Sequence, residues 1–194
     1  MPDMILKPMT ALGSDVALSE TFGAITIAEK PDIAIASVAL RGDAPVPTTI
    51  FGVSLPGPGG MASGEGVTII WSAPRQWIVL GEGRAEQDFA SEVKAAVEEC
   101  SVTEQTDGFV CIYVISKNGP QPLQDLLTKL VNLDPARLSP GCATRTLVEH
   151  MSVFLVRHSE TRLAILSMRS SAKSLWHALS RTAEFAAHAA AGRG

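Results

Sequence analysis

Residues 143–168 read ATRTLVEHMSVFLVRHSETRLAILSM and decide the fold class. Three runs rich in aliphatic and β-branched residues, at 143–149, 152–157 and 162–168, are separated by short polar breaks, a pattern that favours strands. The break at 158–161 has the length of a hairpin connection. Three strands in succession, with no helix between them, predict a sheet that is antiparallel or mixed rather than parallel.

Further strands are predicted upstream at 33–40, 67–71, 76–80 and 109–115, and the last of these is apolar on both faces, which indicates an interior strand. Three sets of apolar residues recur at helical spacing and predict one buried helix face each. These sets are Phe89, Val93, Ala96, Val97 and Cys100; Leu123, Leu126, Leu127, Leu130 and Val131; and Leu175, Leu179, Ala183 and Ala186. Because strict strand–helix alternation is absent, we expect an α+β fold, an antiparallel or mixed sheet with helices on one face and ferredoxin-like elements.

The predicted domain organisation is simple. A length of 194 residues fits one domain. Residues 1–32 are weakly patterned and are predicted to form an extended N-terminal arm, and residues 33–190 a single α+β domain. Residues 43–66 are so rich in glycine and proline that they predict a loop within that domain.

Composition excludes several classes of protein. The chain is 46% hydrophobic and 19% charged, which argues against intrinsic disorder. Its net charge of −4 argues against a nucleic-acid partner, and no stretch is apolar enough to predict a membrane span. The N-terminus has no secretory pattern, and three widely spaced cysteines predict reduced thiols, so we expect a cytoplasmic protein.

The glycine-rich stretch and the four histidines are the two features that could indicate a cofactor or metal site. The stretch PGPGGMASGEG (56–66) has Ala62 where a dinucleotide fingerprint needs its third glycine, and a strand rather than a helix follows, so a linker is favoured. The four histidines show neither HxH nor HExxH spacing, which favours structural or surface roles over metal binding. We therefore expect no cofactor-binding and no metal-binding residues in this chain.

Two local features offer weaker candidates for chemistry. Arg169, Ser170 and Ser171 precede the last predicted helix and together could bind an anion, although a capped helix with an arginine at the strand end is favoured. Cys142 and His150 could form a nucleophile–base pair, but no third group is present to orient them. No catalytic residue is therefore expected.

Two tryptophans bracket the turn at 72–75. Trp77 alternates with Val79 and is expected in the core. Trp71 is the better candidate of the two for a partner contact, although a core position is favoured for both.

Three segments carry a family resemblance: IIWSAPRQWIVLG (69–81), SKNGPQPLQDLLTKLVNLDPARLSPGCATRTLVEHMSVFLVR (116–157) and RLAILSMRSSAKSLWHAL (162–179). Together they resemble the gamma subunit of heterotetrameric sarcosine oxidase, in which a Trp is followed by Gly-Pro-acidic-Trp, a Ser-Gly-Pro precedes a Leu-rich helix, and an Arg-Ser precedes a helix with Leu-Trp. This chain departs from that pattern at Ala73, in place of Gly, and at Gln76, in place of an acid.

The resemblance implies a fold similar to the glycine-cleavage T-protein modules and a non-catalytic role as a structural or assembly subunit. The complex in that family oxidatively demethylates sarcosine to glycine, with one-carbon transfer to tetrahydrofolate. Its alpha, beta and delta subunits would be the partners, and FAD, FMN, NAD, zinc and tetrahydrofolate would be held by them rather than by this chain.

A stand-alone folate-binding one-carbon module is the alternative. Arg145, Arg169 and Lys173 could supply positive charge for the glutamate tail of a folate, but no acid stands out to pair with its pterin ring.

Overall fold

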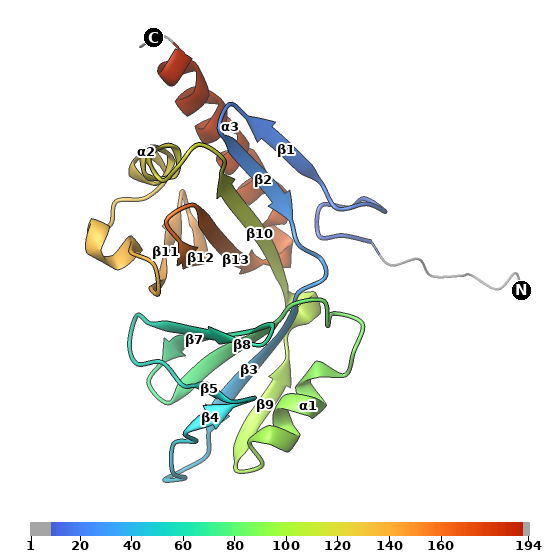
Figure 1. Ribbon diagram of the computed structural model, residues 1–194. Coiled ribbons are helices and arrows are strands. Elements are labelled where there is room, and N and C mark those ends of the chain that lie inside the picture. The colour runs from blue at the N-terminus through green and yellow to red at the C-terminus, as the bar shows by residue number, and fades with distance from the viewer. Residues whose placement is uncertain (1–8, 192–194) are drawn as a thin grey trace, which may run out of the picture.

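Two antiparallel sheets lie one above the other in the computed structural model, which describes residues 9–191 (Figure 1). The six-stranded sheet contains, in spatial order, β1 (Ser19–Phe22), β2 (Ile25–Glu29), β10 (Phe109–Ser116), β13 (Arg162–Met168), β12 (Met151–Ser159) and β11 (Ala143–Val148). The five-stranded sheet contains β6 (Met61–Gly64), β7 (Val67–Ala73), β8 (Gln76–Gly81), β3 (Ala34–Leu40) and β9 (Cys100–Glu104). A short hairpin adds β4 (Thr49–Ile50) and β5 (Val53–Ser54). The predicted α+β class is confirmed, and the three strands of 143–168 are neighbours as expected.

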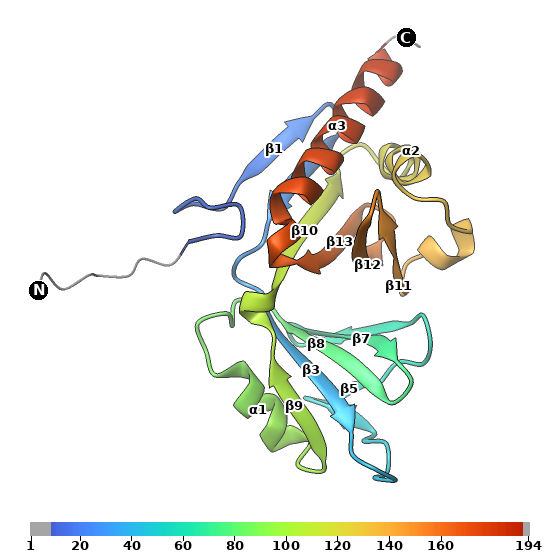
Figure 2. The same cartoon turned by 180° about the vertical axis from the view of Figure 1, so that it is seen from behind.

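Helices cover the outer face of each sheet. The helices α2 (Gln121–Leu130) and α3 (Ala172–Ala191) pack on the six-stranded sheet, and α1 (Phe89–Ala96) packs on the five-stranded sheet (Figure 2). The leucine face predicted for α2 is buried, with Leu123 and Leu126 fully inaccessible. No helix within residues 9–191 is both long enough and apolar enough to cross a membrane.

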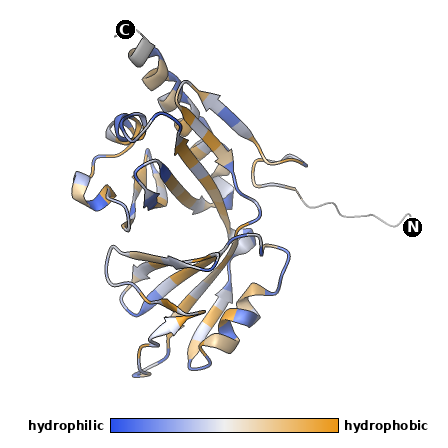
Figure 3. Cartoon of the chain, viewed as in Figure 1, coloured by the Kyte–Doolittle hydropathy of each residue, from blue (hydrophilic) through white to orange (hydrophobic). Residues whose placement is uncertain are grey.

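A third core lies between the two sheets. Side chains of β10 alternate: Val110 and Ile112 face the helices, whereas Cys111 and Tyr113 face the other sheet. Because both of its faces are covered and β2 and β13 flank it, β10 is the interior strand that the sequence predicted. Figure 3 shows hydrophobic residues concentrated on the strands and hydrophilic residues in the turns between them.

Two chain connections pass from one sheet to the other. β2 leads into β3 through residues 30–33, and β9 leads into β10 through residues 105–108, side by side at the waist of the molecule (Figures 1 and 2). Each connection is hydrogen-bonded to the strand that follows the other one, from Lys30 N to Cys111 O of β10 at 2.9 Å and from Gln105 N to Ile35 O of β3 at 2.8 Å. The connections thereby fix the relative position of the sheets and line the pocket described below.

The expectation of an extended arm over 1–32 is wrong for the residues of β1 and β2. β2 pairs with the central strand β10, and its Ile25 and Ile27 are buried under the helices. The period-two pattern of residues 25–29 was the available signal, but only five residues carry it. Residues 1–8 lie outside the described part of the chain.

Two other local expectations need correction. The loop expected over 43–66 contains β4, β5 and β6, and the indole Nε1 of Trp77 holds it in place by donating to Pro56 O at 2.9 Å. Cys100, which the apolar spacing predicts on a helix face, instead begins β9, because α1 ends at Ala96 and the next residue adopts an extended φ. β9 itself was missed because its sequence, CSVTE, carries few apolar residues.

Candidate functional site

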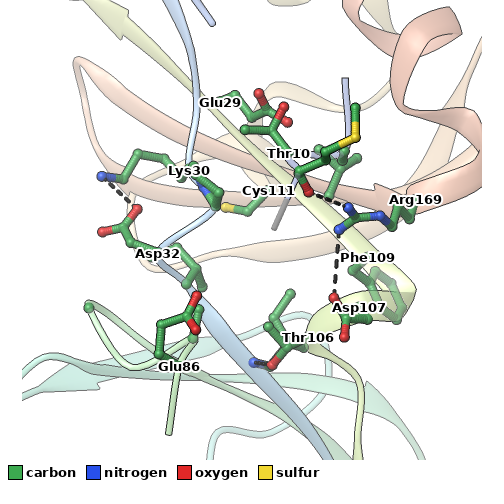
Figure 4. A pocket seen from close by; sticks show the side chains of 18 of the residues that line it. Thr10, Glu29, Lys30, Asp32, Glu86, Thr106, Asp107, Phe109, Cys111 and Arg169 are labelled. Carbon is green, nitrogen blue, oxygen red and sulfur yellow. Dashed lines mark hydrogen bonds and ion pairs between the residues drawn. The ribbon is translucent and has the colours of Figure 1, made fainter. Parts of the chain in front are cut away.

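A pocket of about 370 Å³ opens where the two connections between the sheets meet (Figure 4). Its walls come from segments distant in sequence: residues 9–15, the connection at 30–33, residues 83–86, the segment 106–111, and Arg169. Because it lies at the junction of the two sheets and is lined by both polar and apolar residues, we take it as the candidate site.

Both basic side chains among the described lining residues already have acidic or carbonyl partners. Lys30 Nζ lies 2.9 Å from Asp32 Oδ1. Arg169 Nη2 donates to Met9 O at 2.7 Å, and its Nη1 lies 3.7 Å from Asp107 Oδ1. Figure 4 shows these pairs on opposite sides of the opening. The pocket therefore offers no free cation of its own to an anionic ligand.

Glu29 is a buried carboxylate in the same wall. Only 4% of it is exposed, and its two oxygens accept hydrogen bonds from Leu12 N at 3.1 Å and Leu18 N at 3.4 Å. Backbone donors thus compensate the charge in place of a cation. The role that follows is structural, because these two hydrogen bonds hold residues 12–18 against the end of β2.

Cys111 is the one thiol among the described lining residues, and it is a poor nucleophile. Burial raises its pKa to about 12, with the nearby Asp32 carboxylate adding to the shift. At neutral pH the thiol is therefore protonated, and the thiolate is the reactive form. With no histidine among the described lining residues, the pocket can bind a ligand but presents no nucleophile–base pair.

The residues predicted as an anion site are only partly assembled. Arg169 reaches the pocket, but Ser170 and Ser171 belong to the short 3-10 turn that leads into α3, and no hydroxyl caps that turn. Because the Arg169 guanidinium is engaged by Met9 and Asp107, an anion would have to displace these contacts. Anion binding by the three residues stays a prediction.

The other two predicted contact residues lie elsewhere. Arg145 is exposed on β11, where its Nε donates to Ser152 Oγ at 3.2 Å and its guanidinium lies 5.7 Å from the ring centre of Phe154. Trp71 is half-buried on β7, opposite Trp77, and packs against the core beneath α1. Trp77 is buried, as expected. Arg145, Arg169 and Trp71 therefore form no common site.

The hypothesis that pairs Cys142 with His150 is wrong. The two residues flank opposite ends of β11, whose six residues at about 3.3 Å per step already separate them by about 16 Å. Cys142 Sγ instead contacts Ala136 O at 3.6 Å. Among residues 9–191, no group of three or more His, Cys, Asp or Glu is placed to share a metal ion.

Sequence reasoning missed a polar network that adjoins the pocket, in which Lys30 Nζ lies 5.8 Å from the centre of the Tyr113 ring. One Glu82 carboxylate oxygen accepts hydrogen bonds from Tyr113 Oη at 3.0 Å and from Arg162 Nη2 at 2.9 Å. The Arg162 guanidinium also lies 4.4 Å from the centre of the Tyr113 ring, and the His158 ring lies against the same tyrosine. Glu82 and Arg162 are 80 residues apart, so no local pattern could have revealed the contact.

The network alters the protonation of two of its members. Burial raises the pKa of Tyr113, and the neighbouring Cys111 and Glu82 act in the same direction. Burial lowers the pKa of His158, and the positive charge of Arg162 adds to the effect. Both groups are therefore neutral at pH 7, and the network joins the loop after β8 to β10 and β13 of the other sheet.

Comparison with known proteins gives a match in structure but not in sequence. No protein-family model matches the sequence, and neither does any curated protein. A chain of heterotetrameric sarcosine oxidase from Corynebacterium sp. U-96, solved in complex with pyrrole 2-carboxylate, superposes with a TM-score of 0.67 at 18% identity, over 87% of this chain and 88% of that chain.

Aminomethyltransferase T of the glycine cleavage system from Bartonella henselae superposes with a TM-score of 0.52 at 16% identity. The match covers 82% of this chain but only 46% of the aminomethyltransferase, so this chain corresponds to about half of that enzyme. At such identities the likeness establishes the fold, which is the T-protein-like α+β fold expected from the sequence. A chain of this fold is also present in a heterotetrameric sarcosine oxidase.

Proposed function

We propose that this chain is the gamma-type, non-catalytic subunit of a heterotetrameric sarcosine oxidase. One observation carries the proposal: the match to the Corynebacterium enzyme covers nearly the whole of both chains, whereas the match to the aminomethyltransferase covers less than half of the latter. The likeness is thus to a complete subunit of similar length. The segments 69–81, 116–157 and 162–179 resemble the same family.

The site chemistry supports a role without catalysis in this chain. The pocket thiol is protonated, its two basic residues are paired, and Cys142 lies far from His150. In the proposed complex the alpha, beta and delta subunits are the partners, and they hold FAD, FMN, NAD, zinc and tetrahydrofolate. The reaction is the oxidative demethylation of sarcosine to glycine with one-carbon transfer to tetrahydrofolate, in the cytoplasm.

The pocket favours one second candidate, a stand-alone folate-binding module. Its volume would admit part of a folate, and the fold is shared with an aminomethyltransferase. The charges, however, are badly placed: Arg169 is engaged, and neither Arg145 nor Lys173 lines the pocket. We therefore rank the subunit role first.

Purification of the tagged chain from its own cells tests the proposal. We expect larger chains to co-elute with flavin absorbance bands, and sarcosine to bleach those bands. A colourless eluate of this chain alone, from cells that express the other subunits, would contradict the subunit role. Thermal stabilisation of the isolated chain by tetrahydrofolate would then favour the folate module, because a ligand stabilises the native state that binds it.

A further inference from the structure

The inner face of the six-stranded sheet is longer than the sheet that covers it. Inward-facing residues form rows across β10, β13, β12 and β11. The first row is fully covered and consists of Tyr113, Ala164, Val156 and Ala143. The next row is covered except at Arg145, and its other members are Cys111, Leu166 and Phe154. In a third row, of Phe109, Met168, Ser152 and Leu147, Phe109 still packs against the core between the sheets, whereas the other three residues are exposed. We call this third row, together with Arg145, the open row.

Exposure changes sharply at the open row. Met168 is 51% exposed and Leu147 is 59% exposed, whereas Leu166, two residues before Met168 on the same face, is fully buried. Met9, 54% exposed, lies beside the row with its carbonyl bonded to Arg169. Two large exposed hydrophobic residues, Met168 on β13 and Leu147 on β11, thus lie about 10 Å apart on one sheet face, and Met9 is held near them through Arg169. Such a cluster marks an interaction surface.

Arg145 gives the open row a defined charge. Its Nε is fixed by Ser152 Oγ and its guanidinium lies over the Phe154 ring, so the side chain is held in place. Its two terminal nitrogens have no hydrogen-bond partner among the described residues. A guanidinium held in this way can receive a carboxylate with two parallel hydrogen bonds.

We infer that the open row docks a partner polypeptide that presents an apolar segment together with an aspartate or glutamate, which pairs with Arg145. A symmetric contact between the open rows of two copies fits poorly, because the row itself contains no carboxylate to meet Arg145. The inference deepens the proposed function and rests on it for the identity of the partner, which is another subunit of the oxidase.

A photo-crosslinking amino acid in place of Leu147 or Met168 tests the inference on the purified complex. We expect crosslinks from both positions to a co-purifying larger chain. The matched controls replace Val46 and Phe185, which are 53% and 63% exposed but lie on other elements, and these should yield no such product. A crosslink from the open row to residues 1–8, or to a second copy, would overturn the inference.

Substitutions give an independent readout. The double variant Leu147→Asp with Met168→Asp, and separately Arg145→Glu, should retain at least about tenfold less partner at equal loading, as expected for residues at the centre of an interface. Val46→Asp should retain the partner as the unmodified chain does. Because the substituted residues are exposed, circular dichroism should show each isolated variant folded.

Failure of the inference can be told apart from failure of the proposed function. A flavin-bearing complex that neither crosslinks through the open row nor responds to its substitution would overturn the inference and leave the function standing. A partner that crosslinks through the row but carries no flavin would contradict the function and support the docking surface. A chain that purifies alone would overturn both.

Discussion

The two ends of the space between the sheets use the same strands and differ in what covers them. At one end the loop after β8 closes over Tyr113 and Arg162 through Glu82, and the rows beneath are buried. At the other end Phe109 is still partly covered, but Met168 and Leu147 of the open row are exposed. Leu166 and Met168 are both apolar and face the same way, so exposure is decided by the neighbouring sheet and not by the strand's own alternation.

The largest expected effect separates these two positions directly. Leu166→Asp places an unpaired carboxylate at a fully buried site and should destabilise the chain by about 4 kcal/mol or more, which amounts to loss of folding. Met168→Asp should change the free energy of unfolding by no more than about 0.5 kcal/mol. Chemical denaturation of both variants measures the difference. Equal destabilisation would show that the row at Met168 is covered within the chain.

Thiol chemistry sharpens the comparison at the boundary of the covered rows. The pKa of Cys111 is about 12 in the folded chain, against 9.0 for an unperturbed thiol. At neutral pH the folded chain therefore has about a thousandfold less Cys111 thiolate than the unfolded chain. Because the thiolate is the form that reacts, alkylation should be at least that much slower in the folded chain than in denaturant. Iodoacetamide labelling followed by peptide mass spectrometry measures both rates. Fast labelling of Cys111 in the folded chain would contradict this, because it would mean that the thiol is exposed to solvent in the pocket and that its pKa is not raised.

The closed end should depend on its carboxylate. Glu82→Ala leaves Tyr113 Oη and Arg162 without their shared acceptor, and we expect a loss of about 1 kcal/mol, kept small because Glu82 and Arg162 are both partly exposed. Glu82→Gln retains a carbonyl acceptor and should lose less. If the alanine variant unfolded at the same denaturant concentration as the unmodified chain, the network would contribute nothing to closing this end.

The smallest effect is a pH dependence of the same network. His158 has a lowered pKa in the folded chain, so the unfolded chain binds a proton more readily. Its contribution to stability is therefore complete above the unfolded pKa of about 6.5 and declines as the pH falls through the folded value. Thermal unfolding at neutral and mildly acidic pH should show this decline, and His158→Asn should weaken it. An unchanged decline in the variant would assign it to other groups.

The elements whose pattern is long and local could be predicted from the sequence. The two-faced apolar run at 109–115, the leucine face of α2 and the three strands of 143–168 all formed as expected. β2 was missed because five residues carry too short an alternation, and β9 because it carries few apolar residues.

The candidate site was less accessible to sequence reasoning. The pocket joins segments from residue 9 to residue 169, and the network at the closed end joins residues 80 positions apart. Such contacts depend on how the two sheets stack, which no local pattern contains. Arg169 was singled out by its position before a helix, yet its partners, Met9 and Asp107, could be identified only from the fold.

Oxidative footprinting of Met168 tests the central claim most directly. The chain is exposed to hydroxyl radicals in isolation and in the purified complex, and oxidation is read by peptide mass spectrometry. Because Met168 is half exposed and lies in the open row, we expect its oxidation to be strong in the isolated chain and largely suppressed in the complex, while that of Phe185 changes little. Equal oxidation of Met168 in the two samples would contradict the account, since the open row would then remain uncovered in the assembled protein.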